Sequence, residues 1–320
     1  MFDVVALGES LIDFTPAGTN DQGMALFARN PGGAPANVLA MRAKLGGKTA
    51  FIGKVGSDAF GQFLRGTLEC AGIDTSGMLA DTAIPTTLAF VQLSSTGDRS
   101  FSFYRKPGAD VMLSRQEVPP ALLRSCRVFH FGSVSLTDEP CRSATLWAAR
   151  QARQAGALIS YDPNYRPLLW QNTETALDQM LGAMRLAHLV KVSDEELLLL
   201  TGTQDLQAGA AKLRSLGPAA VVVTQGARGA FVQTAVTSVQ RPAYPYAAVD
   251  TTGAGDAFWG ALLSRVDGLG LSGLQALSAN DWRGILDFAN AAGSLTITRR
   301  GAIPAMPDAE AIRACIASRQ

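Results

Sequence analysis

Residues 250–256, DTTGAGD, combine small residues with a carboxylate just before a stretch of helical periodicity. Gly253, Ala254 and Gly255 allow backbone N–H groups at a helix start to close on an anion, and the helix dipole adds to the attraction. A carboxylate would be out of place there as an anion ligand. Asp256 is suited instead to take a proton from an alcohol while the amides hold a transferring phosphoryl group. A Gly-rich turn in which Asp256 caps the helix explains the same letters.

A second group of small and polar residues lies at 31–40, PGGAPANVLA. Gly32 and Gly33 permit close backbone approach, and Asn37 would project from the following helical turn with both a donor and an acceptor. Asp13 follows the first expected strand, at the edge where ligands of open α/β sheets bind. Taken alone, a plain turn explains the two glycines as well as a ligand does, and it explains Asp13 better.

Two further clusters follow expected strands. In 161–170, YDPNYRPLLW, the guanidinium of Arg166 can hold phosphate or sugar oxygens, although a surface ion pair explains it too. In the segment 223–232, VTQGARGAFV, three residues would let a nucleotide approach the backbone, but a β-hairpin turn is the leading alternative. These residues are Thr224, Gly226 and Gly229.

The chain supplies a scaffold for these clusters by alternating short apolar runs with helical patterns. The apolar runs are continuous, which is typical of parallel strands covered on both faces. They lie at 3–9, 49–56, 157–164, 189–193 and 220–226. Helical patterns occur at 35–45, 144–156, 195–202 and 206–217. The repeated order predicts a doubly wound α/β sheet in one domain over residues 1–320.

One region departs from this order. Residues 86–94 and 99–106 have the pattern of two strands, with Phe103 and Arg105 on one face of the second. Four turn-forming residues join them, Ser95, Thr96, Gly97 and Asp98. Another stretch without helical period precedes the first helix and can pair with this hairpin. We expect a small β lid inserted in the α/β core, from segments at about 14–30 and 85–106.

The composition narrows the classes of function. Lys and Arg number 28 and Asp and Glu 27, so the net charge of +1 argues against a dedicated nucleic-acid-binding protein. No apolar run approaches the ~20 residues of a membrane span, and the N-terminus has no signal-peptide features. Four scattered cysteines and two histidines argue against a zinc cluster. A reducing, cytoplasmic compartment is therefore expected.

Together and in this order, the clusters resemble those of the ribokinase-like (PfkB-type) sugar kinases. GGAPAN at 32–37 and DTTGAGD at 250–256 match the two family signatures. Within the family, the stretches 103–110 and 128–146 look most like fructokinases. The resemblance implies a ribokinase-like α/β/α sandwich with a mostly parallel central sheet and a small inserted β lid over the sugar.

The resemblance also implies roles for single residues. Asp256 would be the catalytic base, beside an anion hole formed by Gly253, Ala254 and Gly255. The implied sugar contacts are Asp13, Gly32, Gly33, Asn37, Phe103, Arg105, which would reach down from the lid, and Arg166. The implied nucleotide contacts are Lys191, Ser193, Glu196, Thr224, Gly226, Gly229 and Asn290. At the position of Ser193 the family often has Asn. Asp250, Thr252 and Gly301 resemble a loop that binds a monovalent metal cation.

The implied activity is ATP-dependent phosphorylation of the primary 6-hydroxyl of D-fructose, with ATP, Mg²⁺ and K⁺ as cofactors. A 2-keto-3-deoxygluconate kinase is a close alternative, because NYRPLLW at 164–170 also occurs there, although a Tyr typically replaces Phe103. An aminoimidazole riboside or nucleoside kinase is a further option. A non-catalytic sugar sensor would not need Asp256. The expected ligands are a sugar and ATP, with neither nucleic acid nor membrane as partner. The exposed edge of the lid could pair two copies into a homodimer.

Overall fold

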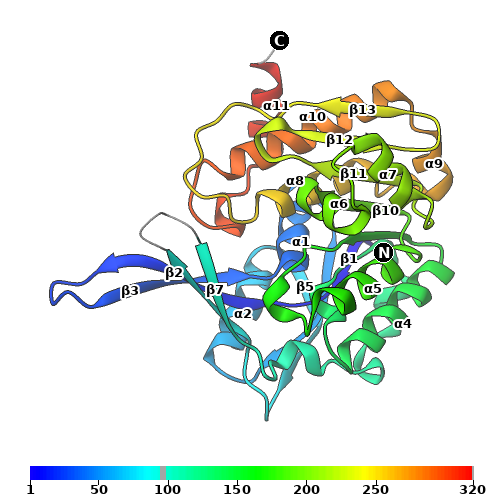
Figure 1. Cartoon of the computed structure of the whole chain (residues 1–320). Coiled ribbons are helices and arrows are strands. Elements are labelled where there is room, and N and C mark those ends of the chain that lie inside the picture. Colours follow the sequence, from blue (N-terminus) through cyan, green and yellow to red (C-terminus); the bar gives the residue numbers. More distant parts are fainter. Residues whose placement is uncertain (94–98, 319–320) are drawn as a thin grey trace.

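A nine-stranded sheet forms the centre of the molecule (Figure 1). The structure is a computed structural model that describes residues 1–93 and 99–318. In spatial order the strands are β13 (Ser238–Arg241), β12 (Ala230–Gln233), β11 (Ala220–Thr224), β10 (Leu189–Ser193), β9 (Leu158–Asp162), β8 (Cys126–Gly132), β1 (Phe2–Leu7), β4 (Thr49–Gly56) and β5 (Ile73–Asp81). All neighbours are parallel except β11 with β12 and β12 with β13.

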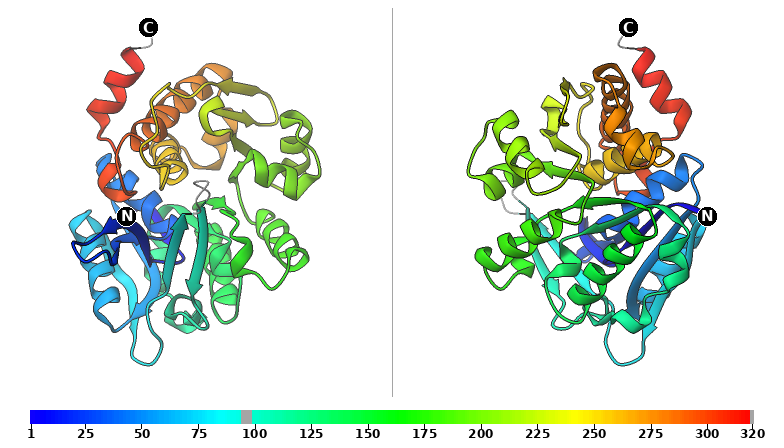
Figure 2. Two further views of the ribbon diagram at one scale, coloured as in Figure 1. Left: turned by 60° about the vertical axis from the view of Figure 1, so that its left-hand side comes forward. Right: turned by 90° about the vertical axis from the view of Figure 1, so that its right-hand side faces the viewer.

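Helices cover both faces of this sheet and bury two apolar clusters (Figure 2). Successive strand residues point to opposite faces, so Val4 and Ala6 belong to one cluster and Val5 and Leu7 to the other. Residues of α1 (Ala34–Lys44), α2 (Ala59–Cys70), α8 (Ala254–Val266), α9 (Gly270–Ala276), α10 (Ala279–Thr296) and α11 (Ala309–Ala317) complete the first cluster. The second includes α3 (Pro120–Arg124), α4 (Cys141–Gln154), α5 (Thr173–Met184), α6 (Asp194–Thr201) and α7 (Leu206–Arg214).

The expected scaffold is confirmed in its main lines. Strands β4 and β10 match the apolar runs at 49–56 and 189–193, and the other expected strands lie within two residues of their runs. The segment 223–232 forms a hairpin, as its simpler explanation had it: β11 turns into β12 through a 3₁₀ turn at Gly226–Arg228. Strands β12 and β13 have four residues each, too short for periodicity to reveal.

A second sheet of four strands projects from the core (Figure 1). Its order is β3 (Ala25–Gly32), β2 (Leu11–Thr19), β6 (Leu88–Leu93) and β7 (Arg99–Tyr104), with β2 and β6 parallel and the two outer pairs antiparallel. The expected lid segments, at about 14–30 and 85–106, contain most of these strands, but β2 begins at Leu11 and β3 ends at Gly32, outside the first segment. The turn expected at Ser95, Thr96, Gly97 and Asp98 lies outside the described residues. Phe14 and Phe90 stack at 4.8 Å between ring centroids and join β2 to β6.

Both histidines and three of the four cysteines, Cys126, Cys141 and Cys315, are buried. His130 in β8 is buried and contacts Ser160 Oγ through Nδ1 at 2.9 Å, and burial lowers the pKa of its imidazole to about 4. It is therefore a neutral core residue. The four cysteines are free, and the described part of the chain contains no group of three or more metal-ligating side chains. Within the same residues, no helix is long and apolar enough to cross a membrane.

Candidate active site

The Gly-Gly turn before α1 packs directly against the end of β1 and the start of β2. Gly33 has a φ of 111°, in the left-handed region, and a Cβ there would overlap the carbonyl oxygen of Glu9. A Cβ on Gly32 would overlap the carboxylate of Asp13. Position 33 therefore requires glycine, and a side chain at position 32 would displace the carboxylate of Asp13. The close approach brings Asp13 and the start of α1 together at the carboxyl edge of the sheet, as predicted for ligand-binding residues.

Helix α8 begins at Gly253, whose φ of 76° only glycine adopts at low cost. A Cβ on Gly253 would lie 2.5 Å from Cβ of Ala302, so the turn packs tightly against the loop after α10. The first N–H groups of a helix have no partner within it. Ala254 N–H makes a long 3.3 Å bond to the carbonyl of Thr251. The amides of the next residues, Gly255 and Asp256, are therefore the better candidates to receive an anion.

Asn37 and Asp256 meet across the interface of α1 and α8. Asn37 Nδ2 donates a hydrogen bond of 2.8 Å to Asp256 Oδ2. The two helices approach closely because α8 has Gly260 at the crossing, where a Cβ would lie 2.6 Å from the carbonyl oxygen of Val38. Burial raises the pKa of Asp256, against the opposing effects of the Asn37 hydrogen bond and the charge of Lys191. A carboxylate with a raised pKa is a better proton acceptor.

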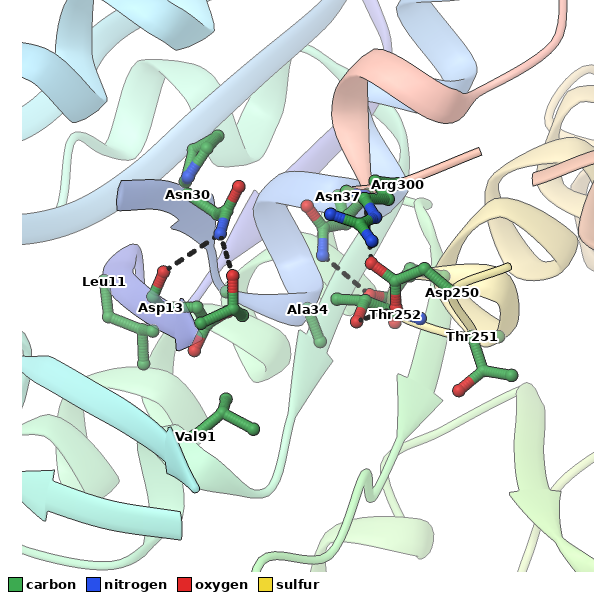
Figure 3. Close-up of a pocket in the computed structure, with 18 of the residues that line it drawn as sticks. Leu11, Asp13, Asn30, Ala34, Asn37, Val91, Asp250, Thr251, Thr252 and Arg300 are labelled. Atoms are coloured by element: carbon green, nitrogen blue, oxygen red, sulfur yellow. Dashed lines mark hydrogen bonds between the residues drawn. The ribbon is translucent and has the colours of Figure 1, made fainter. Parts of the chain in front are cut away.

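A cavity of about 600 Å³ joins these elements (Figure 3). Residues expected at the site and found in its lining are Asp13, Gly33, Asn37, Phe103, Arg166, Lys191, Asp250, Thr252, Gly253, Gly255, Asp256 and Gly301. Expected residues that are not among its lining residues are Gly32, Ala254, Arg105, Ser193, Glu196, Thr224, Gly226, Gly229 and Asn290. The structure thus brings most of the expected sugar contacts, the expected base and the expected cation loop together, and leaves most of the expected nucleotide contacts outside this cavity.

Asp13 is a second, partly buried carboxyl in this cavity. Burial raises its pKa to about 6, which the positive charge of Arg166 opposes and the negative charge of Asp256 reinforces. Its backbone carbonyl accepts a 3.3 Å hydrogen bond from Asn30 Nδ2, which also donates to Thr15 Oγ1 at 2.8 Å. The side chain of Asn30 thus ties β3 to β2 beside the cavity (Figure 3).

A buried lysine lies beside the start of α8. Lys191 Nζ pairs with Asp162 Oδ2 at 2.5 Å, and both side chains are buried. Burial opposes the charge of Lys191, but the carboxylates of Asp162 and Glu196 outweigh it and raise the pKa of the ammonium group. A Cβ on Gly255 would lie 3.5 Å from Nζ. The ammonium therefore adds a fixed positive charge to the candidate anion hole.

Ser193 and Glu196 form a capping box at the start of α6. Ser193 Oγ accepts from the amide of Glu196 at 3.0 Å, and Glu196 Oε2 accepts from the amide of Ser193 at 2.8 Å. Glu196 Oε1 accepts from the amide of Tyr165 at 2.7 Å. Both side chains are therefore engaged in shaping the loop next to Lys191, and a nucleotide contact by either residue stays a prediction.

The remaining expected nucleotide contacts gather at the antiparallel edge of the sheet. A Cβ on Gly229 would overlap the carbonyl oxygen of Arg241, and Asn290 Nδ2 donates to that same oxygen at 3.1 Å. Thr224 and Gly226 belong to the neighbouring hairpin. Gly229 and Asn290 thus both contact the end of β13. Their role in nucleotide binding stays a prediction.

Asp250 connects the two segments of the expected cation loop. Its Oδ1 accepts from Thr252 N–H at 3.0 Å and from Thr252 Oγ1 at 2.7 Å. Its Oδ2 accepts from Gly301 N–H at 3.0 Å. This one carboxylate therefore holds the turn before α8 against the loop after α10. Figure 3 shows Arg300 pointing toward it from that loop.

Arg105 differs from its expected place. We expected it to reach down to the sugar, but its guanidinium forms a buried ion pair with Asp110, with Nη2 2.7 Å from Oδ2. It also donates to Thr137 Oγ1 at 2.8 Å and to the carbonyl of Val134 at 3.0 Å. The alternation of residues predicted the face of the hairpin on which Arg105 lies. It did not predict the ion pair with Asp110, a buried carboxylate.

Among the lining residues that sequence reasoning missed are Glu9, Asn30 and Arg300. Glu9 follows β1 at the same sheet edge as Asp13, so the edge rule used for Asp13 applies to it as well. Asn30 and Arg300 had no such signal, because their positions depend on how the second sheet and the loop after α10 fold back.

Comparison with known proteins settles the family. The model of the pfkB family of carbohydrate kinases matches residues 1–309. The chain belongs to this family. It is 44% identical over 309 residues to a protein of Arabidopsis thaliana named probable fructokinase-4. This alignment covers 95% of this chain and 93% of that one. The fructokinase of Xylella fastidiosa with bound ATP has a TM-score of 0.92 and 34% identity, over 100% of this chain and 99% of that one.

A further solved structure carries ligands of several kinds. It is a fructokinase double mutant of Vibrio cholerae O395 with fructose, ADP and a potassium ion bound, at a TM-score of 0.87 and 34% identity over 98% of each chain. The ribokinase-like fold implied by the two signatures, GGAPAN and DTTGAGD, is thus confirmed for this PfkB carbohydrate kinase.

Proposed function

We propose that this PfkB kinase is a fructokinase, which transfers the γ-phosphoryl group of ATP to the 6-hydroxyl of D-fructose and releases fructose 6-phosphate and ADP. The observation that carries the proposal is the hydrogen bond between Asn37 and Asp256 at the start of α8, in the cavity that Asp13 also lines. The similarity to several proteins named fructokinase over nearly the whole chain supports fructose as the acceptor.

The chemistry follows from the places of four groups. Asp256 accepts the proton of the 6-hydroxyl as the hydroxyl oxygen attacks the γ-phosphorus and the bond to the bridging oxygen of ADP breaks. The amides of Gly255 and Asp256 and the ammonium of Lys191 stabilise the equatorial oxygens of the transferring group. Asp13 accepts hydrogen bonds from sugar hydroxyls and orients the acceptor.

Mg²⁺ fits this site as an ion carried by the nucleotide. Magnesium usually takes one or two protein carboxylates and completes its shell with phosphate and water, so it needs no protein-only cage. Burial and the neighbouring charge of Asp162 raise the pKa of Glu196, so its ionised form is disfavoured. A divalent cation between nucleotide and protein would stabilise that ionised form. Asp162 and Glu196 would then hold the ion, which neutralises charge on the phosphates when bound.

The second sheet is proposed to act as the lid of the sugar site. Val91 of β6 and Phe103 of β7 line the cavity together with Asp13, so the sheet forms one wall of the sugar site. Its outer edge, β3, also exposes Leu26 and Phe27, and Met24 just before this strand is exposed as well. An unpaired apolar edge favours addition of a second copy, so we propose a homodimer through this sheet. Replacing Phe27 by Glu should then shift the sedimentation coefficient to that of a monomer.

The substrate is tested by measuring ATP-coupled kcat/KM for fructose, 2-keto-3-deoxygluconate, ribose, adenosine and aminoimidazole riboside under the same ions. Fructose should give the highest value. Phe103 presents no hydroxyl to a substrate carboxylate, and a lost hydrogen bond to a charged group costs about 1.5–3 kcal/mol. The variant Phe103→Tyr should therefore move the preference toward 2-keto-3-deoxygluconate. A higher value for that acid with the unmodified protein would overturn the assignment of fructose while leaving the kinase site in place.

A further inference from the structure

The first turn of α1 is capped by a side chain far from it in the sequence. The amide of Ala34, the first residue of the helix, donates a 3.0 Å hydrogen bond to Glu9 Oε1. The residue at the N-cap position, Gly33, has no side chain, and Pro35 has no N–H group to satisfy. Glu9 therefore supplies the contact that an N-cap side chain would ordinarily make.

A local cap is excluded by the geometry of the turn. Gly33 has a φ of 111°, and a Cβ at that position would overlap the carbonyl oxygen of Glu9. Ser, Thr or Asp, which usually cap helices, cannot take its place without moving this backbone. Glu9 thus contacts the turn twice, through its backbone against Gly33 and through its carboxylate on Ala34.

Glu9 makes this contact under costly conditions. The residue is 5% exposed and lines the cavity, and its Oε2 has no hydrogen-bond partner among the residues that the structure describes. Burial raises the pKa of its carboxyl to about 7, and the charge of Asp110 acts in the same direction while that of Arg105 opposes it. A half-satisfied buried carboxyl lowers stability unless it serves another purpose.

The purpose follows from what α1 carries. Asn37 lies in its first turn, three residues after Ala34, and donates the hydrogen bond that orients Asp256. A loose first turn would therefore move both the sugar-binding glycines and the amide of Asn37. We propose that Glu9 is a positioning residue of the sugar site, which fixes the Gly32–Gly33 turn and the start of α1. This inference rests on the proposed function and adds a residue to it.

The test compares Glu9→Ala with Glu9→Gln and with a matched control, Asp205→Ala. Glutamine keeps an acceptor for Ala34 N–H, and its amide group would take the place of Oε2, which has no partner in the described residues. Asp205 is another helix-capping carboxylate, which accepts from Ala208 N–H at 2.8 Å in α7 and is not among the lining residues of the cavity. It reports the cost of losing a cap as such.

Glu9→Ala should raise KM for fructose about tenfold, equal to ~1.4 kcal/mol, and lower kcat, while KM for ATP stays within about twofold. Glu9→Gln should restore both sugar parameters to within about threefold of the unmodified protein, and Asp205→Ala should change neither. A glutamine variant as impaired as the alanine variant, or an alanine variant with an unchanged KM for fructose, would overturn the proposal.

Amide hydrogen exchange gives a readout that needs no turnover. Exchange of the Ala34 amide should be about tenfold faster in Glu9→Ala and unchanged in Glu9→Gln. If Glu9→Ala does not fold, Glu9→Asp, whose carboxylate is retracted by one carbon, replaces it and should show intermediate effects. Equal exchange in all variants refutes the role of Glu9. Normal protection by Glu9 without phosphorylation of fructose would refute the substrate assignment alone.

Discussion

The side-chain amide of Asn37 donates a 2.8 Å hydrogen bond to Oδ2 of Asp256, which joins the first turns of two helices 219 positions apart in the sequence. The bond fixes the orientation of the carboxylate and engages one of its two oxygens. We therefore assign proton acceptance to the other oxygen, Oδ1. The contact depends on the close crossing of α1 and α8, so the chemistry of the site depends on helix packing.

Asp256→Asn should bind sugar and nucleotide and lose turnover. The amide cannot accept the proton of the hydroxyl, and loss of a general base costs about 10²–10⁴ in kcat. Steady-state kinetics and calorimetric titration with fructose separate the two effects. Asp267→Asn is the control. Asp267 directly follows the same helix, and its buried carboxylate pairs with Arg42, with Oδ2 2.6 Å from Nε. Turnover near normal in Asp256→Asn would contradict the assignment of the base.

Gly260→Ala should weaken both the fold and the reaction. The added Cβ would lie 2.6 Å from the carbonyl oxygen of Val38, so α1 and α8 must move apart, at about 1–3 kcal/mol of unfolding free energy. The Asn37–Asp256 bond lengthens with them and kcat falls. Gly284→Ala is the control in the interior of α10, where a Cβ meets open space and alanine should stabilise by up to about 1 kcal/mol. Unchanged kcat in Gly260→Ala would show that the crossing does not set the geometry.

Arg105→Ala should act mainly on stability. Its loss leaves the carboxylate of Asp110 buried without its ion-pair partner, which typically costs about 3–5 kcal/mol. Arg166 is the matched comparison, because it lines the cavity and is exposed. Arg166→Ala should raise KM for fructose with little change in the free energy of unfolding. Denaturant titrations and KM values for both substrates distinguish the variants. A large rise in KM for fructose in a fully stable Arg105→Ala protein would instead show that Arg105 contacts the sugar directly.

Potassium should raise the rate over sodium or a bulky organic cation. The carboxylate of Asp250 already joins Thr252 to Gly301, and a monovalent ion in this loop would further order the turn that begins α8. The measurement is kcat at equal ionic strength in the three cations. Asp250→Asn should reduce the difference between them. Equal rates in all three cations would rule out a cation role for this loop.

Acidification should impair sugar binding through Asp13. Burial raises its pKa from 3.8 to about 6, so KM for fructose should rise as pH falls below about 6 and the carboxylate is protonated. Stability follows the opposite course. The folded state holds the proton more tightly than the unfolded state, so this group favours folding at low pH and that contribution is lost between about pH 4 and 6.

Asp13→Asn should remove that slope. Above pH 6 the variant should be more stable than the unmodified protein by on the order of 2–3 kcal/mol, while its KM for fructose should be high at every pH. Thermal unfolding across pH 4–8 provides the measurement. Parallel stability curves for the two proteins would show that Asp13 has an ordinary pKa.

The parts of the fold that the sequence predicts are those with continuous signals. Parallel strands such as β4 and β10 are uniformly apolar, and glycines in GGAPAN and DTTGAGD are required by positive φ or close packing at Gly33 and Gly253. Short strands such as β12 carry too few residues for a period to emerge. The candidate base Asp256 and its partner Asn37 were predictable because they follow Gly253 and Gly33 within about one helical turn.

The partners of two buried carboxylates were not predictable. Nothing in the local sequence places Asp110 against Arg105, or Glu9 against the amide of Ala34. Both depend on which buried donor and acceptor the tertiary fold brings together, and a period of two or 3.6 residues gives no information about that. The sequence showed the side chains available at this edge of the sheet but not how they pair.

Strand β2 has two roles along a single length of chain. It pairs with β3 continuously from Leu11 with Gly32 to Pro16 with Phe27, so its first residues contribute Asp13 to the cavity and its remainder forms the middle of the second sheet. A two-stranded ribbon with continuous hydrogen bonds is stiff, so it moves as one unit. Any swing of its tip must therefore turn Asp13 and the Gly-Gly corner at its base. Opening of the proposed lid and displacement of the proposed sugar contact Asp13 would therefore occur together.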